Sequence, residues 1–114
     1  MLERFAVPYV GSGPATLCLG LDKVMCKRLA LASGIATPKW FCADKTGTLL
    51  PQLPMPYPVI LKPRYEGSGS GISHASIIRD ADALTRRVGA LLTEWRQPIL
   101  VEEFIPFGEL TVCV

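Results

Sequence analysis

The clearest pattern in the chain is an amphipathic helix that begins after Asp80. Apolar residues recur there at helical spacing, and Asp80 is a preferred N-cap residue. Pro98, which disfavours helix before it, limits the helix at its C-terminal end. The apolar stripe that we expect to face the core consists of Leu84, Val88, Leu91, Leu92 and Trp95.

Two apolar runs flank this helix in the sequence and predict buried strands. They are Val59–Lys62 and Ile99–Ile105, both rich in β-branched and other apolar residues. A second helix is predicted at Asp22–Ser33, since Asp22 is a suitable N-cap and Gly34 suits a left-handed C-terminal cap.

Weaker patterns complete the predicted element order. Pro14 is placed as the first residue of a helix, with Ser12 or Gly13 as its cap. Further strands are predicted at Phe5–Val10, at Pro38–Ala43, within Ile72–Ile78 and at Glu109–Val114, and a loop at Asp44–Pro58. One long helix between runs of strands predicts an α+β fold with a mostly antiparallel sheet.

Composition narrows the class of protein. The 114 residues suffice for one domain, and the apolar content of 49% is enough for a packed core. The net charge is +2 and the 12 basic residues are scattered, which argues against a dedicated nucleic-acid or membrane-surface protein. No stretch of the sequence is long and apolar enough to span a bilayer.

The cysteines do not predict a metal site. They occur at positions 18, 26, 42 and 113 without a C-x-x-C pair, and His74 is the single histidine. Zinc sites need four converging nitrogen or sulfur ligands. We therefore expect free thiols in a reduced protein.

The stretch from Glu66 to Gly71 is the first candidate for chemistry. Its glycines permit positive φ angles, and consecutive backbone N–H groups in such loops bind phosphate oxygens. Lys62 ends the preceding strand and Lys23 begins the second helix, so two cations are candidates for neutralising a polyphosphate. The spacing fits neither a Walker A loop nor the dinucleotide fingerprint. The alternatives are a flexible turn for the loop and solvated surface positions for the lysines.

The segment from Leu100 to Glu109 is the second candidate. Its backbone and the apolar side chains of Phe104 and Ile105 suit a nucleotide base, and Glu109 suits sugar hydroxyls. The alternative is an edge strand carrying two solvated glutamates.

Taken together, these segments resemble the D-alanine–D-alanine ligases of the ATP-grasp superfamily. The resemblance covers nearly the whole chain in the right order. It is carried by Leu2-Glu3 with Val7-Pro8-Tyr9-Val10-Gly11-Ser12-Gly13-Pro14, by Leu21-Asp22-Lys23-Val24-x-x-Lys27, by Val59-Ile60-Leu61-Lys62-Pro63-x-x-Glu66-Gly67-Ser68-x-x-Gly71, and by Leu100-Val101-Glu102-Glu103-Phe104-Ile105 with Glu109-x-Thr111-Val112.

The resemblance implies a role for each matched position. Lys23 and Lys62 match lysines that contact ATP phosphates, Ser68 matches a serine that also positions the amino-acid substrate, and Glu109 matches the glutamate that binds ribose. The loop that closes over the phosphates corresponds to Glu66, Gly67, Ser68, Gly69, Ser70 and Gly71. The connector whose backbone contacts adenine corresponds to Glu102, Glu103, Phe104 and Ile105. Many members of the family carry a second serine where this chain has Gly69.

The resemblance also implies the reaction and the cofactors. ATP phosphorylates a carboxylate, and an amine then displaces phosphate to form an amide, with Mg²⁺ bridging the phosphates. The expected substrate is D-alanine. The expected setting is peptidoglycan precursor synthesis in the bacterial cytoplasm. The resemblance is also compatible with a homodimer of the full-length protein.

The same resemblance suggests that the chain is truncated at both ends. Residues 1–14 match the end of an N-terminal substrate domain, and residues 15–114 match the first lobe of the ATP-grasp domain. The magnesium ligands of such ligases, carboxylates and an asparagine, lie further toward the C-terminus, and this sequence contains no asparagine. We therefore expect no metal ligands among these residues and no turnover from this chain alone. The alternatives are another ATP-grasp amino-acid ligase, a non-catalytic nucleotide-binding protein, or half of a split enzyme.

Overall fold

The structure is a computed structural model that describes residues 2–44 and 53–110. At its centre lies a four-stranded antiparallel sheet in the order β1-β4-β2-β3. This confirms the predicted α+β class and the predicted central strands. The bounds of the strands are Trp40–Ala43 for β1, Val59–Pro63 for β2, Ile77–Ile78 for β3 and Ile99–Glu103 for β4.

Strand β4 lies inside the sheet. It pairs with β1 on one side and with β2 on the other, so that Glu102 lies opposite both Trp40 and Ile60. Successive residues of a strand point to opposite faces. Ile99 and Val101 therefore face one side of the sheet, and Leu100 and Glu102 face the other.

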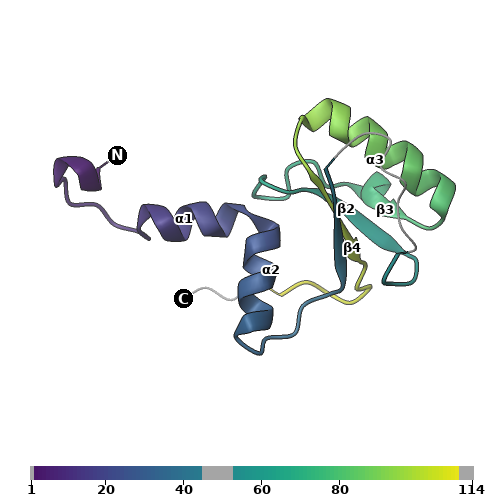
Figure 1. Cartoon of the computed structure of the whole chain (residues 1–114), viewed down its shortest axis with the longest axis horizontal. Coiled ribbons are helices and arrows are strands. Elements are labelled where there is room, and N and C mark those ends of the chain that lie inside the picture. The colour runs from purple at the N-terminus through teal and green to yellow at the C-terminus, as the bar shows by residue number, and fades with distance from the viewer. Residues whose placement is uncertain (1, 45–52, 111–114) are drawn as a thin grey trace.

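Helix α3 (Ala81–Trp95) covers the first of these faces (Figure 1). Asp80 caps it, because its carboxylate accepts a hydrogen bond of 2.8 Å from the Ala83 N–H. The predicted apolar stripe is confirmed. Leu84, Val88, Leu91 and Leu92 are buried, and Trp95 packs against the same core.

Helix α2 (Lys23–Ala32) lies on the opposite side of the sheet from α3 (Figure 1). The Asp22 carboxylate caps it by accepting from the N–H groups of Val24 and Met25. Gly34 (φ +74°) ends it, with the Ile35 N–H donating to the Ala30 carbonyl at 2.8 Å. This is the hydrogen-bond pattern of a glycine-terminated helix, as the sequence predicted.

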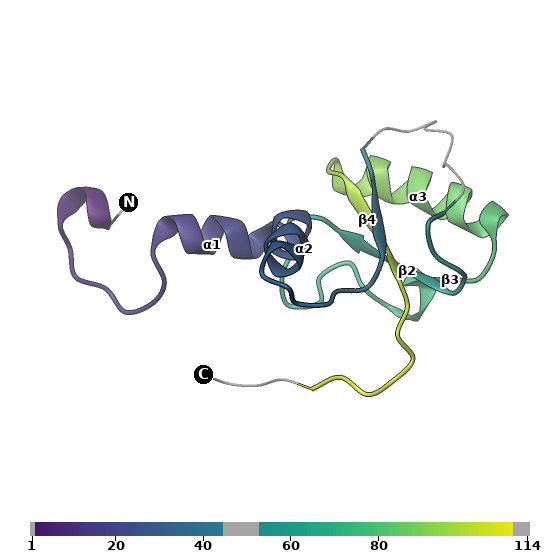
Figure 2. The ribbon, with the colours of Figure 1, turned by 60° about the horizontal axis from the view of Figure 1, so that its bottom comes forward.

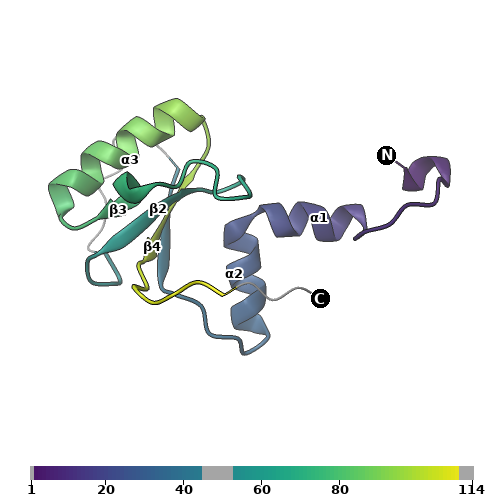
Figure 3. The same cartoon turned by 180° about the vertical axis from the view of Figure 1, so that it is seen from behind.

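The N-terminal arm extends away from the sheet (Figure 3). It contains the 3₁₀ turn η1 (Glu3–Phe5) and helix α1 (Pro14–Leu21), and neither has a buried residue. Pro14 is the first helical residue after Gly13, as predicted. The strand predicted at Phe5–Val10 is wrong, because no strand among the described residues lies beside this apolar run to pair with it.

Other predicted elements were only partly correct. The region Ile72–Ile78 contains one short strand, preceded by the 3₁₀ turn η2 (His74–Ser76). After β4 the chain leaves the sheet as an extended segment without strand pairing up to residue 110 (Figure 2), so the strand predicted at Glu109–Val114 does not begin where expected, and its residues 111–114 lie outside the described ones. Residues 45–52 of the predicted loop also lie outside them.

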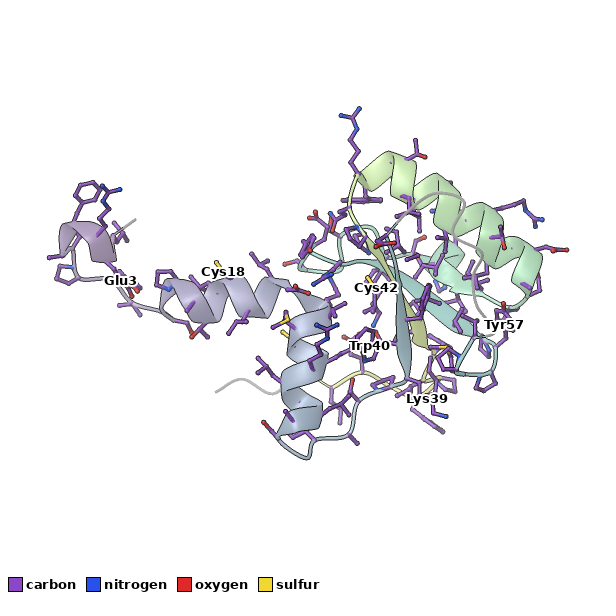
Figure 4. All side chains as sticks on the ribbon, in the orientation of Figure 1. Glu3, Cys18, Lys39, Trp40, Cys42 and Tyr57 are labelled. Atoms are coloured by element: carbon purple, nitrogen blue, oxygen red, sulfur yellow. The ribbon has the colours of Figure 1, made fainter. Side chains whose placement is uncertain are left out.

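The described cysteines are free thiols, as expected. Cys18 lies on α1 and Cys42 on β1, far apart in Figure 4, and Cys26 is exposed on α2.

Candidate functional site

An open cleft of about 430 Å³ lies beside the end of β4, on the face of the sheet away from α3. Ile60 and Lys62 of β2 form one part of its wall, and residues 102–109 form another. Pro38 and Ile72 complete the lining. The wall is mostly apolar and carries a few charged side chains, a composition typical of small-molecule sites.

The cleft brings together half of the predicted binding residues. Those that line it are Lys62, Glu102, Glu103, Phe104, Ile105 and Glu109. The residues that do not line it are Lys23, Glu66, Gly67, Ser68, Gly69 and Ser70. The strand pairing explains the first group, because β2 and β4 are adjacent and Lys62 and Glu102 share one face.

Glu102 is the electrostatic centre of this face. It is only 7% exposed and pairs with two lysines, through Oε1 with Lys27 at 3.0 Å and through Oε2 with Lys62 at 3.2 Å. The alternative of an edge strand with two solvated glutamates is therefore wrong for Glu102. Its neighbour Glu103 points the other way and is half-buried.

The backbone at the end of β4 presents a donor and an acceptor. The Glu103 N–H donates to the Lys39 carbonyl at 2.9 Å, and the Phe104 N–H donates to the Pro58 carbonyl at 3.2 Å. The Lys39 N–H donates to the side chain of Glu103 at 3.3 Å and not to its backbone. Within residues 2–44 and 53–110, the Ile105 N–H donates no backbone hydrogen bond, and the Lys39 N–H does not donate to the Glu103 carbonyl. These two groups are therefore candidate contacts for a ligand.

Lys23 lies at the base of the glycine loop. Its ammonium donates to the Pro63 carbonyl at 2.8 Å and to the Glu66 carbonyl. Burial lowers the pKa of Lys23, and the positive charge of Lys62 lowers it further. The two cations therefore lie close enough to repel each other, and an anion between them would relieve that repulsion.

The glycine loop is exposed at its tip and anchored at both ends. Ser68 (φ +52°) and Gly69 (φ +72°) adopt left-handed conformations, and residues 67–70 are exposed. At its start the Glu66 carboxylate accepts from the Gln97 amide at 2.8 Å. At its end Gly71 packs so closely on Pro63 and Trp95 that a Cβ atom there would overlap both. The tip is therefore exposed to solvent, whereas both ends pack against the rest of the protein.

An ion pair fixes α2 against the end of β2. Asp22 and Arg64 make two hydrogen bonds, of 2.8 Å through Nε and 2.6 Å through the terminal nitrogen. The Lys23 N–H also donates to the Arg64 carbonyl at 3.2 Å. These contacts place Lys23 beside the loop.

Replacing Asp22 by asparagine is expected to make the free energy of unfolding less dependent on pH in the acidic range. Arg64 lowers the pKa of Asp22 from its ordinary value of 3.8. The ion pair therefore stabilises the fold above that pH, and its contribution is lost as the pH falls through the lower pKa of the folded state. Asparagine still caps α2 but carries no charge. We expect a loss of about 1 kcal/mol near neutral pH that becomes smaller as the pH falls below 3.8. Urea unfolding of both proteins across this range measures the difference, and parallel pH profiles would contradict it.

Lys27 is the charged residue of this region that the sequence prediction omitted as a site residue. It is buried at 8% exposure, and its ammonium also donates to the Thr37 hydroxyl at 2.6 Å and the Pro38 carbonyl at 3.1 Å. The sequence feature that could have identified Lys27 is its spacing of four residues from Lys23, which places both lysines on the same side of a helix.

The described residues contain no group of three or more His, Cys, Asp or Glu side chains that could hold a metal ion. None of the helices in the described part of the chain is long and apolar enough to cross a membrane.

The sequence of this chain aligns with known proteins over its whole length. A D-alanine–D-alanine ligase from Marinomonas sp. is 41% identical over 116 aligned residues, which cover 100% of this chain and 35% of that protein. The chain thus spans about a third of the length of this relative. No protein-family model matches the chain.

Solved structures agree with this relationship. A D-alanine–D-alanine ligase from Bacillus anthracis superimposes with a TM-score of 0.70 at 28% identity, over 91% of this chain and 34% of that one. The ligase from the same organism complexed with ATP gives a TM-score of 0.67 at 26% identity, again over 91% and 34%. The chain therefore corresponds to about a third of the D-alanine–D-alanine ligases to which it is similar, and it has the ATP-grasp fold of that part.

Proposed function

We propose that this chain forms the adenine-binding and phosphate-binding part of an ATP-dependent carboxylate–amine ligase. One observation carries the proposal. At the end of β4, the Glu103 carbonyl and the Ile105 N–H are candidate ligand contacts in the same cleft that Lys62 lines.

The backbone pair is complementary to adenine. Adenine presents an amino donor next to a ring nitrogen acceptor, so it fits a carbonyl acceptor next to an N–H donor. Guanine presents the opposite order on that edge and would leave both backbone groups unpaired, which is costly in a desolvated site. Phe104, Ile105 and Phe107 line the same cleft and supply apolar surface to it.

The phosphates would lie toward the two lysines. Lys62 lines the cleft, and Lys23 lies at the base of the glycine loop with its charge close to that of Lys62. In this proposal the loop from Glu66 to Gly71 covers the phosphates, Ser68 helps to position the amino-acid substrate, and Glu109 binds ribose. The solved ATP complex of a relative with this fold supports the nucleotide assignment.

The complete reaction that we propose is the ligase reaction of the relatives. It joins two amino acids, D-alanine by the name of the relatives, through an acyl phosphate formed from ATP. We place the product in peptidoglycan precursor synthesis in the cytoplasm. Residues 1–14 are proposed to belong to a substrate domain and residues 15–114 to the first ATP-grasp lobe, in a full-length protein that could form a homodimer. When bound, Mg²⁺ would neutralise phosphate charge.

Thermal unfolding with and without ATP tests the proposal. A ligand that binds only the folded state, present at about a hundred times its dissociation constant, adds about 2.7 kcal/mol of stability. We therefore expect ATP to raise the melting temperature clearly, and GTP at the same concentration to raise it much less. No shift with ATP would refute nucleotide binding, and equal shifts with both nucleotides would refute the assignment of the base site.

A further inference from the structure

Two lysines of different character share the Glu102 carboxylate. Lys62 forms an ion pair with Oε2, and its side chain is 25% exposed at the cleft. Lys27 pairs with Oε1, its side chain is 10% exposed, and it does not line the cleft. Only Lys62 is therefore placed to meet a ligand.

Lys27 is held by the protein alone. Besides Glu102 it donates to the Thr37 hydroxyl and the Pro38 carbonyl, so each of its three N–H groups has an acceptor. Both of these acceptors belong to the segment between α2 and β1. Lys27 thereby links α2, this segment and β4 around one carboxylate.

We infer that Lys27 is a positioning residue that lets Lys62 leave Glu102 for a phosphate group. The inference rests on the proposed nucleotide-binding function. A phosphate that enters the cleft competes with Glu102 for the Lys62 ammonium. When Lys62 turns toward it, Oε2 of Glu102 loses its partner while Oε1 keeps Lys27.

The reason is the cost of an unpaired buried charge. Removing one partner of a buried ion pair is strongly destabilising because it leaves the other charge uncompensated. Without Lys27, Lys62 would be the one remaining ion-pair partner, among the described residues, of a carboxylate that is only 7% exposed. The carboxylate would then hold Lys62 in place and oppose the binding of phosphate.

The Lys27→Met variant tests this inference with two probes, ATP and adenosine, in titration calorimetry. We expect the affinity for ATP to fall about tenfold or more, and that for adenosine, which has no phosphate, to change less than about twofold. Arg28→Met is the matched control, because Arg28 is an exposed cation on the same helix that forms no ion pair with another described residue. If Lys27 had only a structural role, its replacement would lower the affinities for ATP and for adenosine equally.

The same substitution in a Glu102→Gln background gives the second test. Glutamine carries no charge, so it does not retain Lys62, and the loss of Lys27 should then change ATP affinity by less than about twofold. This comparison of Glu102→Gln with the Lys27→Met/Glu102→Gln double variant holds even if Lys27→Met alone does not fold.

The outcomes separate the two proposals. If the unaltered chain binds neither ATP nor adenosine, the proposed function fails. If it binds both, the inference is overturned when Lys27→Met leaves ATP affinity unchanged, when it weakens both ligands equally, or when it has a tenfold effect in the Glu102→Gln background.

Discussion

Replacing Lys62 by alanine is expected to lower the affinity for ATP by about tenfold or more. Hydrogen bonds to charged groups contribute about 1.5–3 kcal/mol, and every 1.4 kcal/mol is about a tenfold change in affinity. Lys62 is the lysine that lines the cleft, with a quarter of its side chain exposed there. Its ammonium can therefore reach a phosphate with little rearrangement of the backbone.

The fold should tolerate this substitution. Glu102 keeps its ion pair of 3.0 Å with Lys27, so its charge is not left alone. We expect the melting temperature without ligand to change little and the affinity for adenosine to stay nearly the same. Arg86→Ala is the control, because this exposed arginine lies on α3, across the sheet from the cleft. Unchanged ATP affinity in Lys62→Ala would remove the phosphate assignment.

Replacing Gly71 by alanine is expected to lower the free energy of unfolding by about 3 kcal/mol. The left-handed backbone (φ +75°) costs a residue with a Cβ atom about 1–2 kcal/mol. The added carbon would also lie 2.7 Å from Cγ of Pro63 and 2.8 Å from Cζ2 of Trp95, and such overpacking costs about 1–3 kcal/mol.

Gly69→Ala separates the two causes. Its φ angle of +72° is nearly the same, but no heavy atom lies within 4 Å of an added Cβ. We therefore expect it to lose only the backbone part, about 1–2 kcal/mol. Urea unfolding of the three proteins measures both effects. Equal losses in the two variants would show that close packing of Gly71 against β2 and α3 does not position the loop.

Local patterns predicted most elements of the sheet and its covering helix. The stripe from Leu84 to Trp95 and the runs at 59–62 and 99–105 determine which faces are apolar, and those faces are buried in the structure. The run Phe5–Val10 has a similar local character but forms no strand. A strand needs a partner, and the pattern of one segment does not show whether a partner lies beside it.

The candidate site was predictable only in part. Lys62 and the segment 102–109 were identified and meet in one cleft, whereas the exposed residues 67–70 do not line it. The burial of Glu102 could not be read from the sequence, because β4 is interior only through its pairing with both β1 and β2. The role of Lys27 was missed for the same reason, since its carboxylate partner lies 75 positions away along the chain.

By itself, the sequence determined the α+β class, the two capped helices α2 and α3, the resemblance to the ligase family and the segments that carry candidate chemistry. These depend on residue spacing and on caps, which act over a few positions. The tertiary structure alone decided that Glu102 is shared by two lysines, that Asp22 fixes Lys23 beside the glycine loop, and that Glu103 and Ile105 line the same cleft as Lys62. The physical reason is that burial and pairing of charges depend on strand order and on contacts between distant segments, which no local pattern specifies.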